Sequence, residues 1–147
     1  MCKDVTLHCL GICSDLNTKE YWMNLVVDQN LPRLGAGISR TVYALNSEQA
    51  LKIEEDESGW RDSQCAKEVT RWRESKPARR ELLATIFESG DRWLIMERAS
   101  TTLQRYRGDD DPHAIIANLR KKIAVGDLHA GNVGVFKGSF KIIDYGM

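Results

Sequence analysis

The chain has 147 residues, and its 21 lysines and arginines balance its 21 aspartates and glutamates, so its net charge at pH 7 is zero. This balance excludes a purely electrostatic binder of nucleic acid or membrane, because such proteins depend on excess positive charge. With 42% hydrophobic and 29% charged residues, the composition is that of a folded globular chain, and we expect one domain over residues 1–147.

No stretch approaches the ~20 apolar residues that a bilayer span needs, and the N-terminus lacks an apolar run of signal-peptide length, so we expect neither a membrane span nor a signal peptide. We therefore expect a cytoplasmic protein. The cysteines lack the repeated C-x-x-C spacing of a zinc site, which predicts reduced thiols. They are Cys2, Cys9, Cys13 and Cys65.

The first half of the chain predicts a helix, a β-hairpin, a third strand and a second helix. Residues 1–30 form an N-terminal extension with a helix from Lys19 to Gln29, where Tyr21, Trp22, Leu25 and Val26 share one face. A glycine-containing bend divides the apolar segment 34–45, which indicates a hairpin. The strand 50–53 follows. Helical spacing of Cys65, Val69 and Trp72 then predicts a helix over 62–73 that ends before Pro77.

The second half predicts a hairpin, a long helix and a last hairpin. The segments 82–87 and 93–96 are strand-like and are separated by the turn 88–91. Asp111-Pro112 is a favourable helix start, and it precedes apolar residues at helical spacing up to Ile123. Alternating apolar residues from 133 to 143, interrupted by Lys137-Gly138, predict the final hairpin.

Three residue types in the first half are typical of a phosphate site. Gly35 and Gly37 lack side chains that would keep backbone amides away from an anion. Lys52 lies inside an apolar strand, where an ammonium needs a compensating anion, and Glu68 on the next helix is a candidate carboxylate. The alternative is equally open at this point: Lys52 reaches water from an edge strand and Glu68 is a solvated helix residue.

A second group of polar residues lies near the end of the chain. Asp127 and Asn132 are separated by four residues on a glycine-containing loop, which suits a catalytic base and a metal ligand. The last hairpin returns Asp144 towards the same place, where an acid and an amide can hold Mg²⁺ through oxygen. As an alternative, both aspartates are ordinary turn residues.

The order of these signals is that of the protein-kinase signature set: glycine-rich hairpin, strand lysine, helix glutamate, D-x-x-x-x-N loop and D-x-G. The chain therefore resembles the protein-kinase-like superfamily from about Leu34 to Gly146. It is most similar to the small kinase domain of the host-shutoff serine/threonine kinases of lytic bacteriophages. That narrower resemblance rests on the Leu-Gly-x-Gly loop, the short segment after 93–96 and the D-x-H-x-G-N loop.

The resemblance implies a minimal kinase-like α+β fold. Its N-lobe over 31–100 would be an antiparallel sheet with one helix, and its truncated C-lobe over 101–147 a helix, a catalytic loop and a hairpin. It also implies roles for individual residues in binding ATP and Mg²⁺. Gly35 and Gly37 would cover the phosphates, and Lys52, oriented by Glu68, would contact them. Asp127 would accept the substrate proton, while Asn132 and Asp144 would hold Mg²⁺. The backbone at Glu97 and Ala99 would bind adenine.

Two departures from the kinase pattern leave other functions open. Val125-Gly126 replaces the usual His-Arg, which argues against regulation by an activation-loop phosphate, and His129 replaces a lysine, as in phosphotransferases that act on aminoglycosides or choline. The chain also ends at Gly146-Met147 without a substrate-binding lobe. We expect one of three consequences: a partner or a second copy supplies the lobe, the protein binds nucleotide without efficient transfer, or it binds a target rather than modifying one.

Three functions are thus kept. The first is a kinase that phosphorylates Ser/Thr of host proteins, in the host cytoplasm if the chain is of phage origin. The second is a catalytically weak binding protein that inhibits or redirects a host enzyme. The third is a small-molecule phosphotransferase with an acidic pocket at Asp109-Asp110-Asp111, although this run is more simply a solvated helix start.

Overall fold

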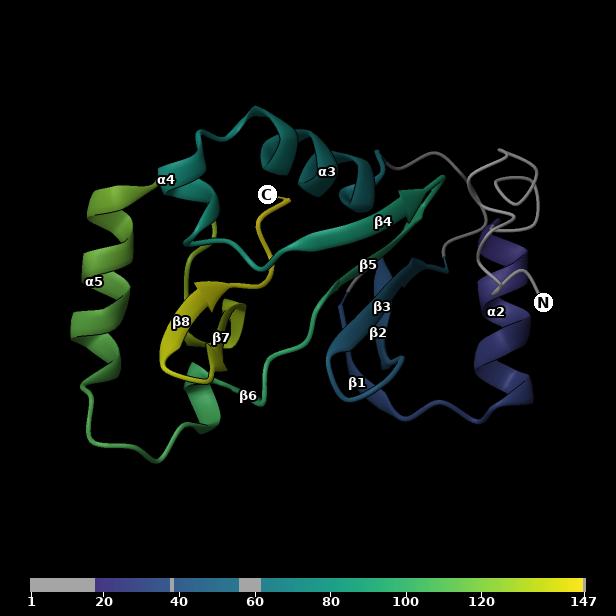
Figure 1. Cartoon of the computed structure of the whole chain (residues 1–147), viewed down its shortest axis with the longest axis horizontal. Coiled ribbons are helices and arrows are strands. Elements are labelled where there is room, and N and C mark those ends of the chain that lie inside the picture. The colour runs from purple at the N-terminus through teal and green to yellow at the C-terminus, as the bar shows by residue number, and fades with distance from the viewer. Residues whose placement is uncertain (1–17, 38, 56–61, 147) are drawn as a thin grey trace.

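The computed structural model describes residues 18–37, 39–55 and 62–146 (Figure 1). Predictions for residues 1–17, including Cys2, Cys9 and Cys13, lie outside the described residues. The described elements in chain order are α2 (Lys19–Asp28), β1 (Arg33–Ala36), β2 (Arg40–Ala44), β3 (Gln49–Glu54), α3 (Gln64–Glu74), α4 (Pro77–Arg80), β4 (Ile86–Gly90), β5 (Trp93–Glu97), β6 (Thr101–Thr102), η2 (Leu103–Arg105), α5 (Pro112–Lys122), η3 (Ala130–Asn132), β7 (Val133–Phe136) and β8 (Ser139–Ile142).

The strands form two antiparallel sheets, which confirms the α+β class. The larger sheet has the strand order β1-β2-β3-β5-β4, so β3 is its central strand, and the smaller has the order β6-β7-β8. Each pair of neighbouring strands is antiparallel. The predicted hairpins β1-β2, β4-β5 and β7-β8 are all present. What the sequence did not predict is the pairing of β3 with β5, which brings Lys52 opposite Leu94.

Helix α2 covers one face of the five-stranded sheet, and its apolar face is the predicted one. Its Thr18 cap accepts a hydrogen bond from the backbone N–H of Tyr21, and the helix ends at Asp28, one residue earlier than expected. Trp22 packs against Trp93 with ring centroids 5.2 Å apart, in a cluster with the outward side chains of β3 and β5. Because side chains alternate along a strand, Lys52 lies on the opposite face from its neighbours Leu51 and Ile53.

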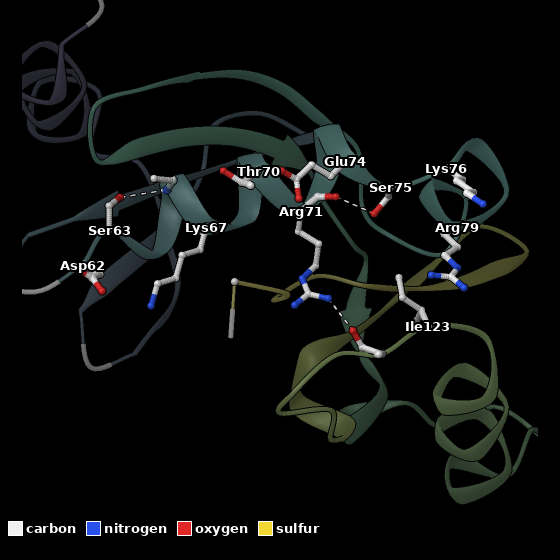
Figure 2. A pocket seen from close by; sticks show the side chains of 13 residues that line it. Asp62, Ser63, Lys67, Thr70, Arg71, Glu74, Ser75, Lys76, Arg79 and Ile123 are labelled. Carbon is white, nitrogen blue, oxygen red and sulfur yellow. Dashed lines mark hydrogen bonds between the residues drawn. The ribbon is translucent and has the colours of Figure 1, made fainter.

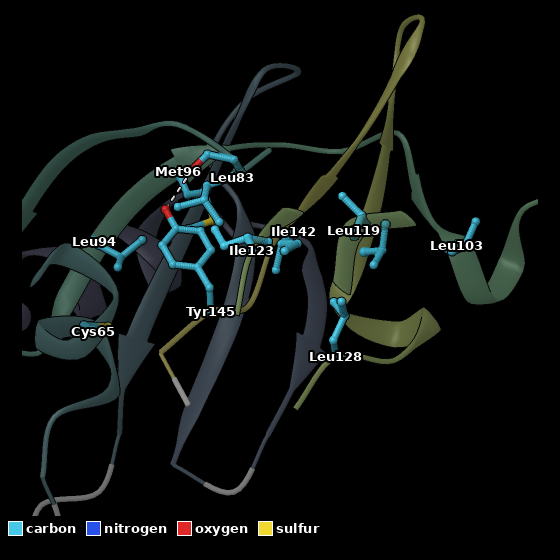
Figure 3. Close-up of a cluster of buried hydrophobic side chains, with 12 residues drawn as sticks. Cys65, Leu83, Leu94, Met96, Leu103, Leu119, Ile123, Leu128, Ile142 and Tyr145 are labelled. Atoms are coloured by element: carbon cyan, nitrogen blue, oxygen red, sulfur yellow. Dashed lines mark hydrogen bonds between the residues drawn. The ribbon is translucent and has the colours of Figure 1, made fainter. Parts of the chain in front are cut away.

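A second apolar core joins the other face of this sheet to the smaller sheet and α5 (Figure 3). Cys65 of α3 and Leu94 lie at one end of this core, and Leu119 of α5 and Leu128 lie at the other. Helix α5 is at the far end of the molecule from α2 (Figure 1). It begins at the predicted place, with Asp111 as the cap, whose side chain accepts a hydrogen bond from His113 N. The core fixes the position of the last hairpin relative to the larger sheet.

The β4-β5 hairpin differs from the prediction by several residues. Strand β4 is Ile86–Gly90, and the turn contains Asp91 and Arg92, the latter with φ of 66°. The segment before it, expected as strand, instead pairs briefly with the end of β8, where Leu83 bridges Ile142. The segment was predicted as a strand of the hairpin because it is apolar. Leu83 is fully buried, and burial requires an apolar residue there whichever strand it pairs with. Gly90 is a strand residue, and the position requires glycine because the Trp93 ring leaves no room for a Cβ.

Helix α4 and strand β6 were also missed, as were the short 3-10 helices η2 and η3. Helix α4 has Pro77 at its first turn, a position where proline is well tolerated, although the sequence indicated only a boundary there. Strand β6 pairs with β7 at the edge of the smaller sheet. Within the described residues, no helix is both long enough and apolar enough to cross a membrane.

Tyr145 is expected to contribute strongly to stability through its hydroxyl as well as its ring. The side chain is fully buried and its hydroxyl donates to Ala84 O at 2.8 Å, as the dashed line in Figure 3 shows. Tyr145→Phe leaves this buried carbonyl without its donor, which costs about 1–3 kcal/mol. Tyr106→Phe is the control, because the Tyr106 hydroxyl bonds Asp110 at an exposed site. Urea unfolding measures both, and equal losses would contradict the expectation.

Candidate active site

Lys52 and Glu68 form a buried ion pair. Lys52 Nζ lies 3.0 Å from Glu68 Oε1 and 3.2 Å from Oε2, and the two residues are 5% and 0% exposed. Lys52 points from the centre of the sheet towards α3, whose start is fixed by Ser63 as its N-cap. Glu68 lies on the inward face of that helix, one turn after Cys65. The sequence left open whether Lys52 pairs with Glu68 or reaches water from an edge strand, and in the structure the two residues are paired.

Arg40 is a second cation in the same cluster, and the sequence interpretation missed it. Its Nη1 lies 2.8 Å from Glu68 Oε1 and its Nη2 lies 3.0 Å from Asp144 Oδ1. The residue is on β2 and is only 7% exposed. A signal was present in the sequence, because the pattern G-x-G-x-x-G-x-V that begins at Gly35 has its third glycine where this chain has Arg40. A guanidinium as buried as that of Arg40 needs an anion nearby.

The backbone around Asp144 is tied to the same ion pair. Lys52 Nζ donates a hydrogen bond to the carbonyl of Ile143, and the backbone N–H of Tyr145 donates to Glu68 Oε2 at 2.7 Å. The Asp144 side chain is 41% exposed, so it reaches solvent although its Oδ1 is bound by Arg40. Helix α3, β2, β3 and the end of the last hairpin therefore meet at one cluster of two cations and two carboxylates.

Electrostatics keep Glu68 ionised in spite of its burial. Desolvation raises the pKa of Glu68, but the charges of Lys52 and Arg40 outweigh it, so the pKa lies below its ordinary value. Burial lowers the pKa of Lys52 by more than Glu68 raises it. For Arg40, desolvation lowers the pKa, but the attractions of Glu68, Cys65 and Asp144 together outweigh it, and the pKa is raised. Burial raises the pKa of the neighbouring Cys65 thiol to about 12, which keeps it protonated at neutral pH.

The depressed pKa of Glu68 predicts a specific loss of stability in acid. An unfolded glutamate binds its proton near pH 4.3, whereas the folded protein binds it only at lower pH. The stabilisation is therefore fully present above about pH 4.3 and is lost as the pH falls through the folded pKa. Urea midpoints measured from pH 6 to pH 3 should fall more steeply for the wild type than for Glu68→Gln. Parallel curves would assign the acid sensitivity to other carboxylates.

The loop that carries Asp127 and Asn132 lies against the Asp144 segment. Asn132 is 8% exposed, and its Nδ2 donates to the backbone carbonyl of Asp127 at 2.6 Å. The Asn132 carbonyl in turn accepts a hydrogen bond from Ile143 N at 2.8 Å, next to Asp144. The Asp127 side chain is 55% exposed, with His129 Nε2 at 3.7 Å from its Oδ2. The structure thus places the backbone of Asn132 beside the segment that carries Asp144, and leaves the Asp127 side chain exposed on the same loop as Asn132.

Gly35 lies on the same sheet as Lys52, Gly37 follows the end of β1, and both glycines are open to solvent. Gly35 is in register with Val42, and Val42 is in register with Lys52, so the three residues form one row across β1, β2 and β3. A Cβ added at Gly35 would meet no atom within 4 Å, so the space above the strand is clear. Gly37 donates its N–H to the carbonyl of Arg40 at 2.8 Å, which closes the turn.

Glu97 and Ala99, the predicted adenine-binding segment, lie where the chain passes from the larger sheet to the smaller one. The side chain of Glu97 pairs with Lys141 Nζ at 3.0 Å and accepts from Thr85 N. Ala99 packs closely on Gly134, where no Cβ would fit. The connection is visible in Figure 1 between β5 and β6. This segment is ordered by contacts on both sides, while its role towards adenine stays a prediction.

A cleft of about 910 Å³ lies on a different side of α3 (Figure 2). Its walls come from the outer face of α3, from α4 and from the segment after α5, and most of the residues that line it are polar or charged. Its lining residues are Asp62, Ser63, Ala66, Lys67, Thr70, Arg71, Glu74, Ser75, Lys76, Arg79, Ile123, Ala124 and Gly146. Arg71 crosses it to reach Ala124 O at 2.6 Å. None of the predicted catalytic, metal or nucleotide residues lines this cleft.

Comparison with known protein families and with curated proteins finds no match to this chain. The case for a function therefore depends on the geometry described above and on the order of the motifs in the sequence.

Proposed function

We propose that the chain is an ATP- and Mg²⁺-dependent phosphotransferase with a minimal protein-kinase-like fold. The observation that carries the proposal is the buried Lys52–Glu68 pair at 3.0 Å, joined through hydrogen bonds to the residues on either side of Asp144. In phosphoryl transfer the protein supplies positioning and charge neutralisation rather than covalent chemistry. A lysine fixed by a glutamate beside a carboxylate meets that requirement.

The nucleotide would lie over β1, β2 and β3, on the side of Lys52. Gly35 and Gly37 would let backbone amides approach the phosphates, because the space above Gly35 is clear. Lys52 would contact the phosphates while Glu68 keeps its ammonium in place. The backbone at Glu97 and Ala99 would then meet the adenine at the connection between the sheets.

The residues present fit Mg²⁺ that arrives with the nucleotide. Mg²⁺ is usually bound by one or two carboxylates together with substrate phosphates, rather than by a cage of protein ligands. Among the described residues, no group of three or more His, Cys, Asp or Glu side chains is gathered for a metal. Asp144 and Asn132, neighbours through the Ile143 to Asn132 hydrogen bond, would supply one carboxylate and one amide oxygen. When bound, the ion would neutralise charge on the phosphates.

Asp127 is the proposed base. The substrate hydroxyl oxygen forms a bond to the γ-phosphorus while the bond from that phosphorus to the bridging β,γ-oxygen breaks, and ADP leaves with the bridging oxygen. The proton of the hydroxyl passes to the Asp127 carboxylate. The exposure of this carboxylate, 55%, suits a substrate as large as a protein. We propose a Ser or Thr hydroxyl of a host protein, as for the phage kinases that the chain resembles.

Transfer of labelled γ-phosphate tests the proposal. The wild type is incubated with ATP and Mg²⁺, alone and with a bacterial lysate, beside Asp144→Asn, which changes the metal-binding carboxylate while the Lys52–Glu68 pair remains. Label should appear with the wild type and be lost with Asp144→Asn. A folded wild type that transfers no label under any of these conditions would overturn the proposal.

The cleft on α3 favours a second candidate, a binding protein that inhibits or redirects a host enzyme. Four of its lining residues are cationic and two are anionic, so it suits an acidic surface. The four cations are Lys67, Arg71, Lys76 and Arg79, and the two anions are Asp62 and Glu74. A charge reversal at Lys67 and Arg79 should then abolish capture of a lysate partner, with phosphate transfer unchanged. Capture that survives the reversal would remove this candidate.

A further inference from the structure

Arg40 connects the ion pair of the proposed active site to the carboxylate proposed for the metal. One guanidinium makes both contacts, Nη1 with Glu68 Oε1 at 2.8 Å and Nη2 with Asp144 Oδ1 at 3.0 Å. Its Nη1 also lies 3.6 Å from Cys65 Sγ. The planar guanidinium suits such a bridge because its donors are fixed in direction, whereas an ammonium offers a single point charge.

The charges of the cluster sum to zero in this arrangement. Lys52 and Arg40 are positive, and Glu68 and Asp144 are negative, so a divalent cation added alone would create an excess of two positive charges. Arg40 also occupies Oδ1 of Asp144, one of the two carboxylate oxygens that a metal ion can bind. Like charges repel strongly at such short range, so a divalent cation bound to Asp144 and the guanidinium of Arg40 would each weaken the attraction of the other to this carboxylate.

We propose that Arg40 is a positioning residue that holds Asp144 as its counter-ion until a divalent cation, accompanied by nucleotide phosphates, displaces it. The neutral cluster binds a metal ion weakly on its own, and the phosphates supply the negative charge that the ion requires. Metal and nucleotide therefore bind together rather than separately. The inference rests on the proposed function only in taking Asp144 as the carboxylate that receives the metal.

The test measures binding of Mn²⁺ alone, by its effect on water proton relaxation, without any activity assay. Arg40→Gln removes one positive charge and frees Oδ1 of Asp144, so Mn²⁺ should bind about tenfold more tightly or better than to the wild type. The added Asp144→Asn substitution should cancel this gain. Arg92→Gln is the matched control, because Arg92, in the turn between β4 and β5, pairs with the buried Glu54 at 3.0 Å, so its replacement also removes one cation from a buried carboxylate.

Two further measurements keep the test decisive if Arg40→Gln does not fold. Arg40→Lys retains the charge but cannot bridge both carboxylates as a fork, and should show a smaller gain in Mn²⁺ affinity. In the wild type, the guanidinium ¹⁵N signal of Arg40 should shift when Mg²⁺ and ADP are added together and stay unchanged with Mg²⁺ alone. The signal of Arg92 provides the internal reference.

The outcomes separate this inference from the proposed function. Unchanged Mn²⁺ affinity in folded Arg40→Gln, or a gain that persists with Asp144→Asn, overturns the role of Arg40 even if the wild type transfers phosphate. A gain that depends on Asp144 supports it even if the wild type transfers no phosphate. In that second case the proposed function fails and the counter-ion role remains.

Discussion

Replacing Glu68 with alanine is expected to lower the free energy of unfolding by about 3–5 kcal/mol, because the substitution leaves buried cations without their partner. For a chain of this size, that loss corresponds to a fall in Tm of roughly 6–20 °C. Glu68 is fully buried and holds three donors at once: Lys52, Arg40 and the backbone N–H of Tyr145. Thermal unfolding followed by circular dichroism measures the change.

Lys52→Met provides the internal comparison for this result. It removes one cation of the cluster but leaves Glu68 with Arg40 and Tyr145 N–H, so its cost should be clearly smaller than that of Glu68→Ala. Glu88→Ala, at an exposed position on β4, should change stability by less than about 0.5 kcal/mol. Equal losses for Glu68→Ala and Lys52→Met would show that Arg40 does not compensate Glu68 in solution.

The elements with strong local signals were predictable from the sequence. Helix α5 has a proline after a capping aspartate and a regular apolar face, and it begins where those signals place it. The β4-β5 hairpin was misplaced because its turn contains Asp91-Arg92, a pair without the glycine that normally supplies a positive φ. Gly90, which suggested a turn, is instead a strand residue that makes room for Trp93. Gly90 faces Trp93 across the hairpin, and residue types alone do not distinguish a glycine that makes room for a ring from one that forms a turn.

The part of the candidate site that the sequence predicted is the part where a charged residue in an apolar segment required an oppositely charged partner. A lysine inside an apolar strand requires an anion, and Glu68 was the available carboxylate one helix later. Arg40 was missed because β2 looked like an ordinary half-buried strand, and only the fold shows that its side chain ends between two carboxylates. The buried hydroxyl of Tyr145 was missed for the same reason, since its acceptor Ala84 is 61 residues away.

Asp127→Asn is expected to reduce phosphate transfer by about 10²- to 10⁴-fold, the usual contribution of a general base. Because an amide cannot accept the substrate proton at neutral pH, the loss should appear in kcat. The affinity for ATP should stay nearly constant, since Asp127 is not part of the cluster around Lys52. Transfer assays together with nucleotide titration measure the two quantities separately.

Stability provides the control for Asp127→Asn. The Asp127 side chain is 55% exposed and lies 3.7 Å from His129, so replacing its carboxylate should change the unfolding free energy by less than about 0.5 kcal/mol. Asp109→Asn, at another exposed loop position, should alter neither stability nor transfer. If Asp127→Asn keeps its full transfer rate, Asp127 is not the base. A parallel loss of rate and stability would instead mean that the substitution disturbs the loop as a whole.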